Sequence, residues 1–238
     1  MAALVPIISP DIFALRPDFR ALSIHAPNVT NTESTTETTT ALLNACNLPC
    51  SAPWAEAHRE AWRTAFRAFG AKPQRTPCSA EALLKRASRD GVIPSVNAVV
   101  DLYNAVSLRF AIPIGGEDAE AYMGAPQLVR AHGDEQFGTT QAGEPFIEMP
   151  EPGEVIWRDE IGVTCRRWNW RQGTRTRIEP SSTHAWFILE ALHPMPDAAL
   201  IEAGAELQRG LKSMSQNSAI EAYLLTVDGS TICKLNAG

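Results

Sequence analysis

Long apolar runs are absent from this 238-residue sequence. A membrane-spanning helix needs roughly 20 consecutive apolar residues, and no stretch approaches that length. The first eight residues carry no basic side chain and are too short for a secretory signal peptide. These absences exclude an integral membrane protein and favour a cytoplasmic one, so we expect no membrane partner.

Cysteine is scarce, with five residues scattered along the chain. Cys46 and Cys50 lie close together, but no second pair of similar spacing completes a zinc site. Free thiols in a reducing compartment explain an odd, scattered set better than a disulfide framework does.

The motifs of several common enzyme classes are also missing. The segment from Ile114 to Glu117 has two glycines but lacks the lysine and helix pattern of a phosphate-binding loop. The five histidines show neither metal-ligand spacing nor pairing with a serine or cysteine elbow. Nucleotide hydrolysis and dinucleotide redox chemistry have no support, and we expect no cofactor and no metal.

Positive charge is in deficit. The chain has 21 Lys and Arg against 27 Asp and Glu, a formal net charge of −6. A protein that coats nucleic acid needs a broad basic face, so this balance excludes that class. It leaves room for a protein that contacts nucleic acid through one local patch.

Apolar periodicity and turn residues predict helices first and short strands later. Helices are expected at 53–69, 79–90, 95–108 and 197–214, with Gly91 closing the second. Strands are expected at 21–24, 127–131, 145–148, 154–157, 163–170, 186–192, and as a hairpin of 221–227 with 231–235 around Asp228-Gly229. The polar tract 30–40 is expected to be a surface loop. We therefore predict one domain over 1–238 with an α+β fold, mainly antiparallel sheets with flanking helices.

Three polar side chains recur at helical spacing in the expected helix 95–108. Asn97, Asp101 and Asn104 fall on one face, while an apolar stripe that includes Val96 falls on another. Such a series either caps and braces the helix or lines a site. Spacing alone leaves both interpretations open.

Arginine and tryptophan interleave between residues 165 and 178. The residues are Arg166, Arg167, Trp168, Trp170, Arg171, Arg175 and Arg177. Arginine binds phosphate and tryptophan stacks on bases, so Arg166, Arg167, Trp168, Arg171 and Arg175 are candidates to hold the single-stranded end of a tRNA. Alternatively the arginines pair with acidic residues elsewhere and the tryptophans enter the core, because a strand sends alternate residues to opposite faces.

One carboxylate lies in an otherwise apolar strand. Glu190 falls within the predicted strand 186–192, where it must find partners or lie at an exposed edge. Glu117 and Asp118 follow two glycines, a placement also typical of solvated loop charges.

Several short motifs between residues 75 and 194 share the pattern of one protein family. They are Leu83-Leu84-Lys85-Arg86, the Asn-x-Val-Val-Asp-x-x-Asn run that starts at Asn97, Val106-Ser107-Leu108, Pro113-Ile114-Gly115, Gly133-Asp134-Glu135-Gln136-Phe137, Gly153-Glu154-Val155 and Cys165-Arg166-Arg167-Trp168-Asn169. In these motifs the chain resembles the editing domain of the bacterial phenylalanyl-tRNA synthetase β subunit, most closely its stand-alone relatives. That domain hydrolyses a wrongly attached amino acid from tRNA. The resemblance implies a mixed α+β fold with an editing cleft.

The resemblance also implies roles for single residues. Asn104 matches an asparagine that lines the editing pocket, and Glu190 matches the glutamate that reads the polar group of the wrong amino acid. We expect these two to be the catalytic residues. Gly115 stands in place of a histidine and Tyr103 in place of a threonine, so specificity for tyrosine is not implied.

The expected substrate follows from the charges near this pocket. A polar amino acid with a cationic end suits a pocket that contains Glu190, Asp101, Glu117 or Asp118, and Asn97, Tyr103 and Gly115 complete the expected substrate-binding set. Some stand-alone relatives remove the arginine mimic canavanine from arginine tRNA, which makes it a candidate. An activated ester needs only a placed water and oxyanion donors, without a triad or metal.

Two functional hypotheses result. The first is a trans-editing aminoacyl-tRNA deacylase, a carboxylic ester hydrolase of translation quality control whose partner is misacylated tRNA. The second is a non-catalytic RNA- or amino-acid-binding module that kept the fold and lost the activity, as the glycine at Gly115 suggests.

Overall fold

A five-stranded antiparallel sheet forms the centre of the fold. The computed structural model describes residues 4–48, 50–215 and 219–235. The strand order is β12-β11-β2-β10-β3. These strands span Gly229–Ile232 (β12), Glu221–Thr226 (β11), Arg20–Pro27 (β2), His184–Ala191 (β10) and Ile114–Asp118 (β3). The long central pair, β2 and β10, is registered from Pro27 opposite His184 to Arg20 opposite Ala191.

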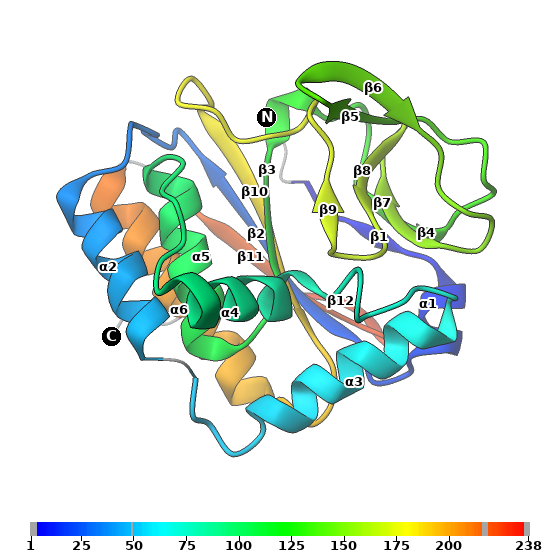
Figure 1. Cartoon of the computed structure of the whole chain (residues 1–238), viewed down its shortest axis with the longest axis horizontal. Helices are drawn as coiled ribbons and strands as arrows, with labels where there is room; N and C mark the ends of the chain where they lie inside the picture. Colours follow the sequence, from blue (N-terminus) through cyan, green and yellow to red (C-terminus); the bar gives the residue numbers. More distant parts are fainter. Residues whose placement is uncertain (1–3, 49, 216–218, 236–238) are drawn as a thin grey trace.

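A second sheet has the strand order β1-β4-β7-β8-β5-β6, with β9 paired to β8. Its strands span Ile7–Ile8 (β1), Gln127–Arg130 (β4), Phe137–Gln141 (β5), Glu144–Glu148 (β6), Val155–Arg158 (β7), Val163–Arg166 (β8) and Arg171–Gln172 (β9). The pairs β1–β4 and β5–β8 are parallel and the other pairs are antiparallel. Figure 1 shows this sheet on the opposite side of β3 from α2, α5 and α6.

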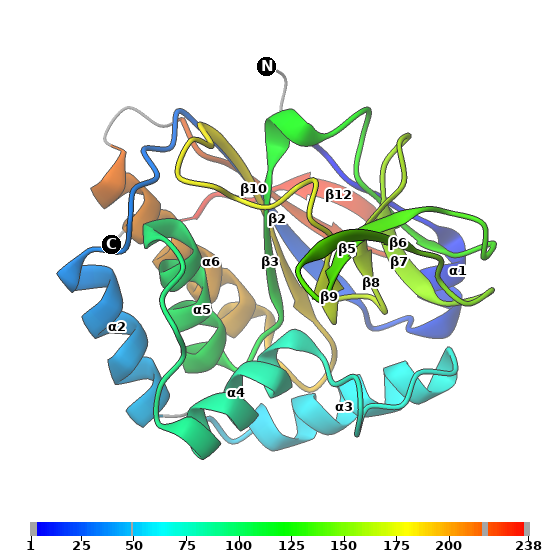
Figure 2. The same ribbon diagram turned by 45° about the horizontal axis from the view of Figure 1, so that its top comes forward.

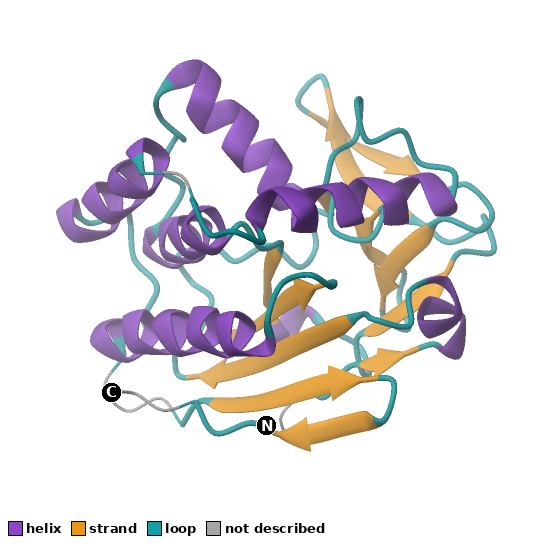
Figure 3. Ribbon diagram, turned by 90° about the horizontal axis from the view of Figure 1, so that it is seen from below, coloured by secondary structure: helices purple, strands orange, loops and turns teal. Residues whose placement is uncertain are grey.

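Six α-helices and one 3₁₀ turn accompany the sheets in the part of the chain that the structure describes. They span Pro10–Leu15 (α1), Thr36–Asn47 (α2), Ala55–Ala68 (α3), Ser79–Asp90 (α4), Ala98–Phe110 (α5), Ala119–Ala121 (η1) and Asp197–Met214 (α6). Figure 3 shows helices lying along the strands of the five-stranded sheet, and Figure 2 shows α3 and α4 along one end of the molecule. The α+β architecture with mainly antiparallel sheets confirms the predicted fold class.

Successive side chains of β10 point to opposite faces of the sheet and divide the core into two clusters. Phe187 and Leu189 join the apolar cluster beneath α5 and α6. Trp186 and Ile188 point the other way, into a cluster shared with the second sheet and α3. Glu190 has the parity of Trp186 and Ile188, so its carboxyl group also faces the second sheet.

The strongest end signals in the sequence are confirmed. α4 ends where Gly91 takes a left-handed φ of +71°, and α6 covers the predicted 197–214. The predicted hairpin forms, but its turn residues are Val227 and Asp228, because Gly229 already pairs with Thr226 as the first residue of β12. Each of these elements has a glycine at a turn or a clear apolar period.

Three sequence predictions are wrong. The tract 30–40 is not all loop, because α2 begins at Thr36 behind a capping box formed by Thr35 and Thr38. Val96 precedes α5 and is 60% exposed, so it does not belong to the buried stripe. The predicted strand 163–170 stops at Arg166 and turns.

None of the helices in the described ranges combines the length and the apolarity that a membrane crossing requires. The five cysteines are free, as the sequence predicts.

Candidate functional site

A cavity of about 260 Å³ lies where β3 and β10 of the five-stranded sheet meet the second sheet. Its wall comes from α4 (Ser79, Ala82, Leu83), α5 (Tyr103, Asn104), β3 (Ile114, Gly115, Gly116, Glu117), β10 (Ile188, Glu190) and the second sheet (Trp157, Cys165, Trp168, Asn169, Trp170, Gln172). Small-molecule sites usually measure ~300–1,000 Å³, so this cavity suits a ligand no larger than an amino acid.

Glu190 is the buried polar centre of the cavity wall. Its side chain is fully buried. Trp157 Nε1 and Trp168 Nε1 donate to Oε1 at 3.1 and 3.0 Å, and Asn169 Nδ2 donates to Oε2 at 2.9 Å. Burial raises the pKa of Glu190 to about 8, although the three N–H donors favour the ionised form.

A tight turn after β8 brings Asn169 against Glu190. Arg167 and Trp168 adopt left-handed φ angles of +47° and +65°, which are unusual for bulky residues. Trp168 N donates to Val155 O at 2.6 Å and fixes the turn to β7. Each such residue costs on the order of 1–3 kcal/mol, and strain of this kind clusters at functional sites.

Two polar atoms in the cavity wall are buried and have no hydrogen-bond partner among the described residues. They are Ser79 Oγ at the start of α4 and Asn169 Oδ1. Asn169 as a whole is 7% exposed. A hydroxyl can donate or accept and an amide oxygen can accept, so the wall offers both functions to a bound molecule.

α5 presents Asn104 and Tyr103 to the same cavity. None of the hydrogen bonds among the described residues uses the Asn104 amide, which leaves it available to a ligand. The Tyr103 ring packs on Gly116, where an added Cβ would lie 2.7 Å from Tyr103 Cε1. A glycine is therefore required at this position.

A second buried carboxyl group forms the other polar end of the wall. Glu117 is 4% exposed and accepts from Thr176 Oγ1 at 2.8 Å, from Gln172 Nε2 at 3.2 Å and from the Tyr122 hydroxyl. Burial raises the pKa of Glu117. The cavity thus lies between two acidic groups and has no lysine or arginine in its lining.

The structure brings together six of the predicted site residues. Asn104, Glu190, Tyr103, Gly115, Glu117 and Trp168 all line the cavity. Trp168, however, is completely buried in the core and offers no surface on which a base could stack. The interpretation that places this tryptophan in the core is confirmed.

Three predicted substrate-binding residues lie outside the lining, because their side chains bind the protein itself. Asn97 caps α5 by accepting from Val100 N at 2.9 Å and donates to Ile178 O at 3.1 Å. Asp101 is fully buried and accepts from Val96 N at 3.0 Å. Asp118 accepts from Ser182 Oγ at 2.6 Å. For Asn97 and Asp101 the geometry matches the capping interpretation.

The arginine run does not form the exposed face of one strand, and several members are paired internally. Arg166 is 5% exposed and forms ion pairs with Glu154 at 2.8 Å and Glu148 at 2.7 Å. Arg171 pairs with the same Glu148 at 2.5 Å, and Arg175 Nη2 lies 2.7 Å from the buried Asp159. The expected alternation is wrong because the chain turns at Arg167.

Sequence reasoning missed Ser79, Trp157, Asn169 and Gln172 as wall residues. Asn169 ends the Cys-Arg-Arg-Trp-Asn motif, a signal that could have identified it. Ser79 stands out only as a helix-start residue, and in the structure Cys78 occupies the cap position instead. Among the residues described, no three His, Cys, Asp or Glu side chains lie together as metal ligands would.

These features define a mixed α+β protein with an acidic, amino-acid-sized cavity. The B3/4 domain family matches residues 61–224, and the chain belongs to this family. The family is related to the editing domain of the phenylalanyl-tRNA synthetase β subunit, which confirms the resemblance at that level. A search of curated proteins gave no match.

Among solved structures, the chain is similar to an N-terminal fragment of the phenylalanyl-tRNA synthetase β subunit from Pyrococcus horikoshii. The TM-score is 0.55 at 8% sequence identity, and the match covers 98% of this chain. The chain spans 55% of the length of that fragment. At this identity the likeness shows a shared fold.

Proposed function

We propose that this protein is a trans-editing hydrolase that removes a wrongly attached amino acid from tRNA in the cytoplasm. The observation that carries the proposal is the meeting of Asn104 and Glu190 in one cavity with two unpartnered polar atoms, Ser79 Oγ and Asn169 Oδ1. Membership of the B3/4 domain family supports it. The cavity volume of about 260 Å³ suits the amino-acid part of the substrate.

Hydrolysis of an aminoacyl ester needs few catalytic groups, because the ester is already activated. The site must place a water against the carbonyl carbon and stabilise the negative charge that develops on the carbonyl oxygen. The Ser79 hydroxyl and the Asn104 amide are the donors that we assign to that oxygen, since neither forms a hydrogen bond with another of the described residues. The vicinal hydroxyl of the terminal ribose can assist the attacking water.

Selection of the amino acid would rest on the acidic wall. Glu190, Glu117 and the Asn169 amide oxygen are acceptors around a cavity that has no basic residue in its lining. A substrate side chain with a cationic, hydrogen-donating end satisfies them, and a neutral side chain leaves buried acceptors unpaired. We therefore retain canavanyl-tRNA of the arginine type as the candidate substrate.

A panel of mischarged tRNAs tests the activity. We expect faster ester loss than in buffer for at least one cationic amino acid. Ser79→Ala and Asn104→Ala should each lower kcat about 100- to 1,000-fold, the usual effect of losing one oxyanion donor. Ser88→Ala on the exposed side of α4 and Asn44→Ala on α2 are the matched controls. No acceleration for any pair would disprove the activity.

The second candidate is a non-catalytic RNA- or amino-acid-binding module, favoured by the glycine at Gly115. A Cβ at Gly115 would lie 3.3 Å from Ile188 Cγ2, so the glycine keeps this part of the cavity open. Tight tRNA binding without turnover, unchanged by Asn104→Ala and Glu190→Ala, would support this alternative.

A further inference from the structure

A second depression, of about 430 Å³, lies between the α3–α4 connection and the loop before β7. Lys72 and Arg75 from the connection and Arg167 from the turn after β8 line one part, and Glu151 and Glu154 line another. The lining of the depression is more polar than that of the cavity. It has no role in the function proposed above.

The charges in this depression do not balance. Both Glu154 oxygens accept from Arg166, whose Nε and Nη2 donate at 3.0 and 2.8 Å, and Arg167 Nε lies 3.6 Å from Oε2 of the same carboxylate. Lys72 and Arg75 are exposed, and neither forms an ion pair within the described residues. Glu154 is therefore shared between Arg166 and Arg167, and Glu151 is the other carboxylate in the lining that faces Lys72 and Arg75.

The surroundings strengthen the excess of positive charge. Residues 55–90 contain eight Lys and Arg against four Asp and Glu, in a chain whose net charge is −6. Burial, together with the nearby charges of Arg166 and Arg171, lowers the pKa of the Arg167 guanidinium, although the charge of Glu154 acts in the opposite direction. An anion bound beside Arg167 would relieve this repulsion.

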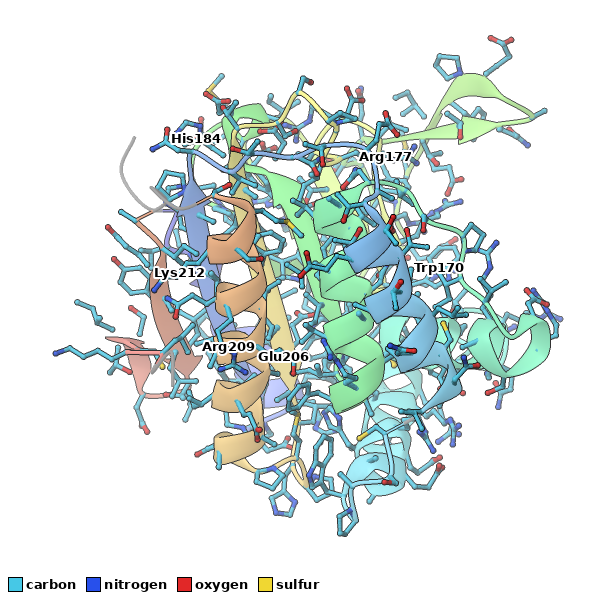
Figure 4. The ribbon with its side chains drawn as sticks, turned by 90° about the vertical axis from the view of Figure 1, so that its left-hand side faces the viewer. Trp170, Arg177, His184, Glu206, Arg209 and Lys212 are labelled. Carbon is cyan, nitrogen blue, oxygen red and sulfur yellow. The ribbon has the colours of Figure 1, made fainter. Side chains whose placement is uncertain are left out.

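One pair of side chains in contact joins the lining of the depression to that of the cavity. Arg167 lines the depression, Trp170 lines the cavity, and the Arg167 guanidinium carbon lies 4.5 Å from the centre of the Trp170 ring. Figure 4 shows Trp170 beyond α5, on the side of the molecule away from Arg209 and Lys212 of α6.

We propose that Lys72, Arg75 and Arg167 bind backbone phosphates of the single-stranded 3′ end of a tRNA whose terminal ester occupies the cavity. The inference rests on the proposed function and names the part of that substrate held outside the cavity. A phosphodiester chain is a flexible anion. When the terminal ester lies in the cavity, the rest of the single strand must leave through the cavity mouth. Arginine binds phosphate through two parallel hydrogen bonds and lysine binds it as a point charge.

Binding of an uncharged arginine tRNA transcript, measured against salt concentration, tests this site. We expect Lys72→Ala/Arg75→Ala to lower the log–log salt slope by roughly 1.4, since each lost single-strand contact removes roughly 0.7. The double variant Arg209→Ala/Lys212→Ala removes the same charge from exposed positions on α6 and should leave the slope unchanged. Far-UV circular dichroism checks that both variants fold.

A transcript without its 3′-terminal CCA locates the contact. It should bind the wild type more weakly than the intact transcript does, and Lys72→Ala/Arg75→Ala should cause no further loss with it. An unchanged slope, equal losses with both transcripts, or an equal loss in the α6 control would overturn the proposal. Uncharged tRNA has no ester to hydrolyse, so absent deacylation with intact CCA-dependent binding would reject the activity and keep the phosphate site.

Discussion

At the scale of single residues, the Glu190 carboxyl group has an unusual set of neighbours. Its three hydrogen-bond partners are neutral N–H groups, from Trp157, Trp168 and Asn169. An indole N–H can only donate, so Oε1 of Glu190 is held as an acceptor in either protonation state. Among the residues that the structure describes, no cationic side chain is in direct contact with the ionised group. A cationic ligand could supply one.

Glu190→Gln tests whether that charge selects the substrate. Glutamine keeps the size and an acceptor oxygen but removes the charge. We expect activity on a cationic misacylated amino acid to fall about tenfold to a thousandfold, or about 1.4–4 kcal/mol of transition-state binding. Activity on a neutral amino acid should change far less, as measured by kcat/KM for the two tRNAs.

The exposed Glu144→Gln on β6 is the control and should change neither value. An equal loss with both substrates would mean that Glu190 serves the fold or the water instead of selectivity.

The substitution Glu190→Gln also has a predicted effect on stability. The pKa of Glu190 rises from 4.5 to about 8 on folding, so the folded chain holds a proton that the unfolded chain releases. Its contribution is fully present below about pH 4.5 and is lost as the pH rises to about 8. The loss is up to ~1.4 kcal/mol per pH unit. Glu190→Gln should remove this slope.

The difference in unfolding free energy between wild type and Glu190→Gln, measured by denaturant titration across this window, isolates the effect. His58 is common to both proteins, so its pKa of about 4, lowered by burial, cancels in the comparison. A difference that does not vary with pH would contradict the prediction.

At the scale of secondary structure elements, the start of α5 depends on one side chain. Asn97 satisfies Val100 N and also reaches Ile178 O, and it is 2% exposed. Asn97→Ala should lower the unfolding free energy by about 1–2 kcal/mol, since a lost helix cap costs ~0.5–2 kcal/mol. Asn97→Ser keeps an acceptor and should lose less.

Denaturant midpoints at constant m-value measure these losses. The exposed Asn44→Ala on α2 should change stability by less than about 0.5 kcal/mol. A loss of kcat far larger than the stability change explains would place Asn97 in the site after all.

The elements that the sequence predicts well carry their own end signals. α4 has Gly91 after it, and α6 has an apolar period along its length. α2 is hidden because threonine is a poor helix former, and its capping box lies inside a tract of similar residues. The turn at Arg167 has no signal either, because it uses left-handed residues that are not glycine.

The same contrast applies to the site. Asn104 and Glu190 follow from the resemblance to a known family. Trp157 and Gln172 come from the second sheet, and their approach to β10 depends on pairing between distant strands. Such pairing leaves no trace in one sequence. The sequence therefore predicts six of the seventeen wall residues.

At the scale of the whole molecule, the two sheets share one apolar cluster. Trp186 and Ile188 of β10 pack in the same cluster as Leu128 and Trp157 of the second sheet. A shared core couples the stability of both sheets. This arrangement supports the sequence-based expectation of one domain, which remains a prediction.

We expect one cooperative thermal transition, with equal calorimetric and van't Hoff enthalpies. Leu128 is fully buried, so Leu128→Ala should cost about 2–5 kcal/mol. It should lower the midpoint of the helix signal and of the near-UV signal equally. Two separated transitions, or a shift in one signal alone, would indicate independent units.

The two indoles that hold Glu190 also make the site visible by fluorescence. Trp157 and Trp168 each donate to the same oxygen, so ionisation of Glu190 changes the electric field across both rings. The wavelength and yield of their emission should titrate with the carboxyl group and respond to a cation bound beside it. The protein therefore carries its own optical probe of occupancy, readable without a label and before any ester is cleaved.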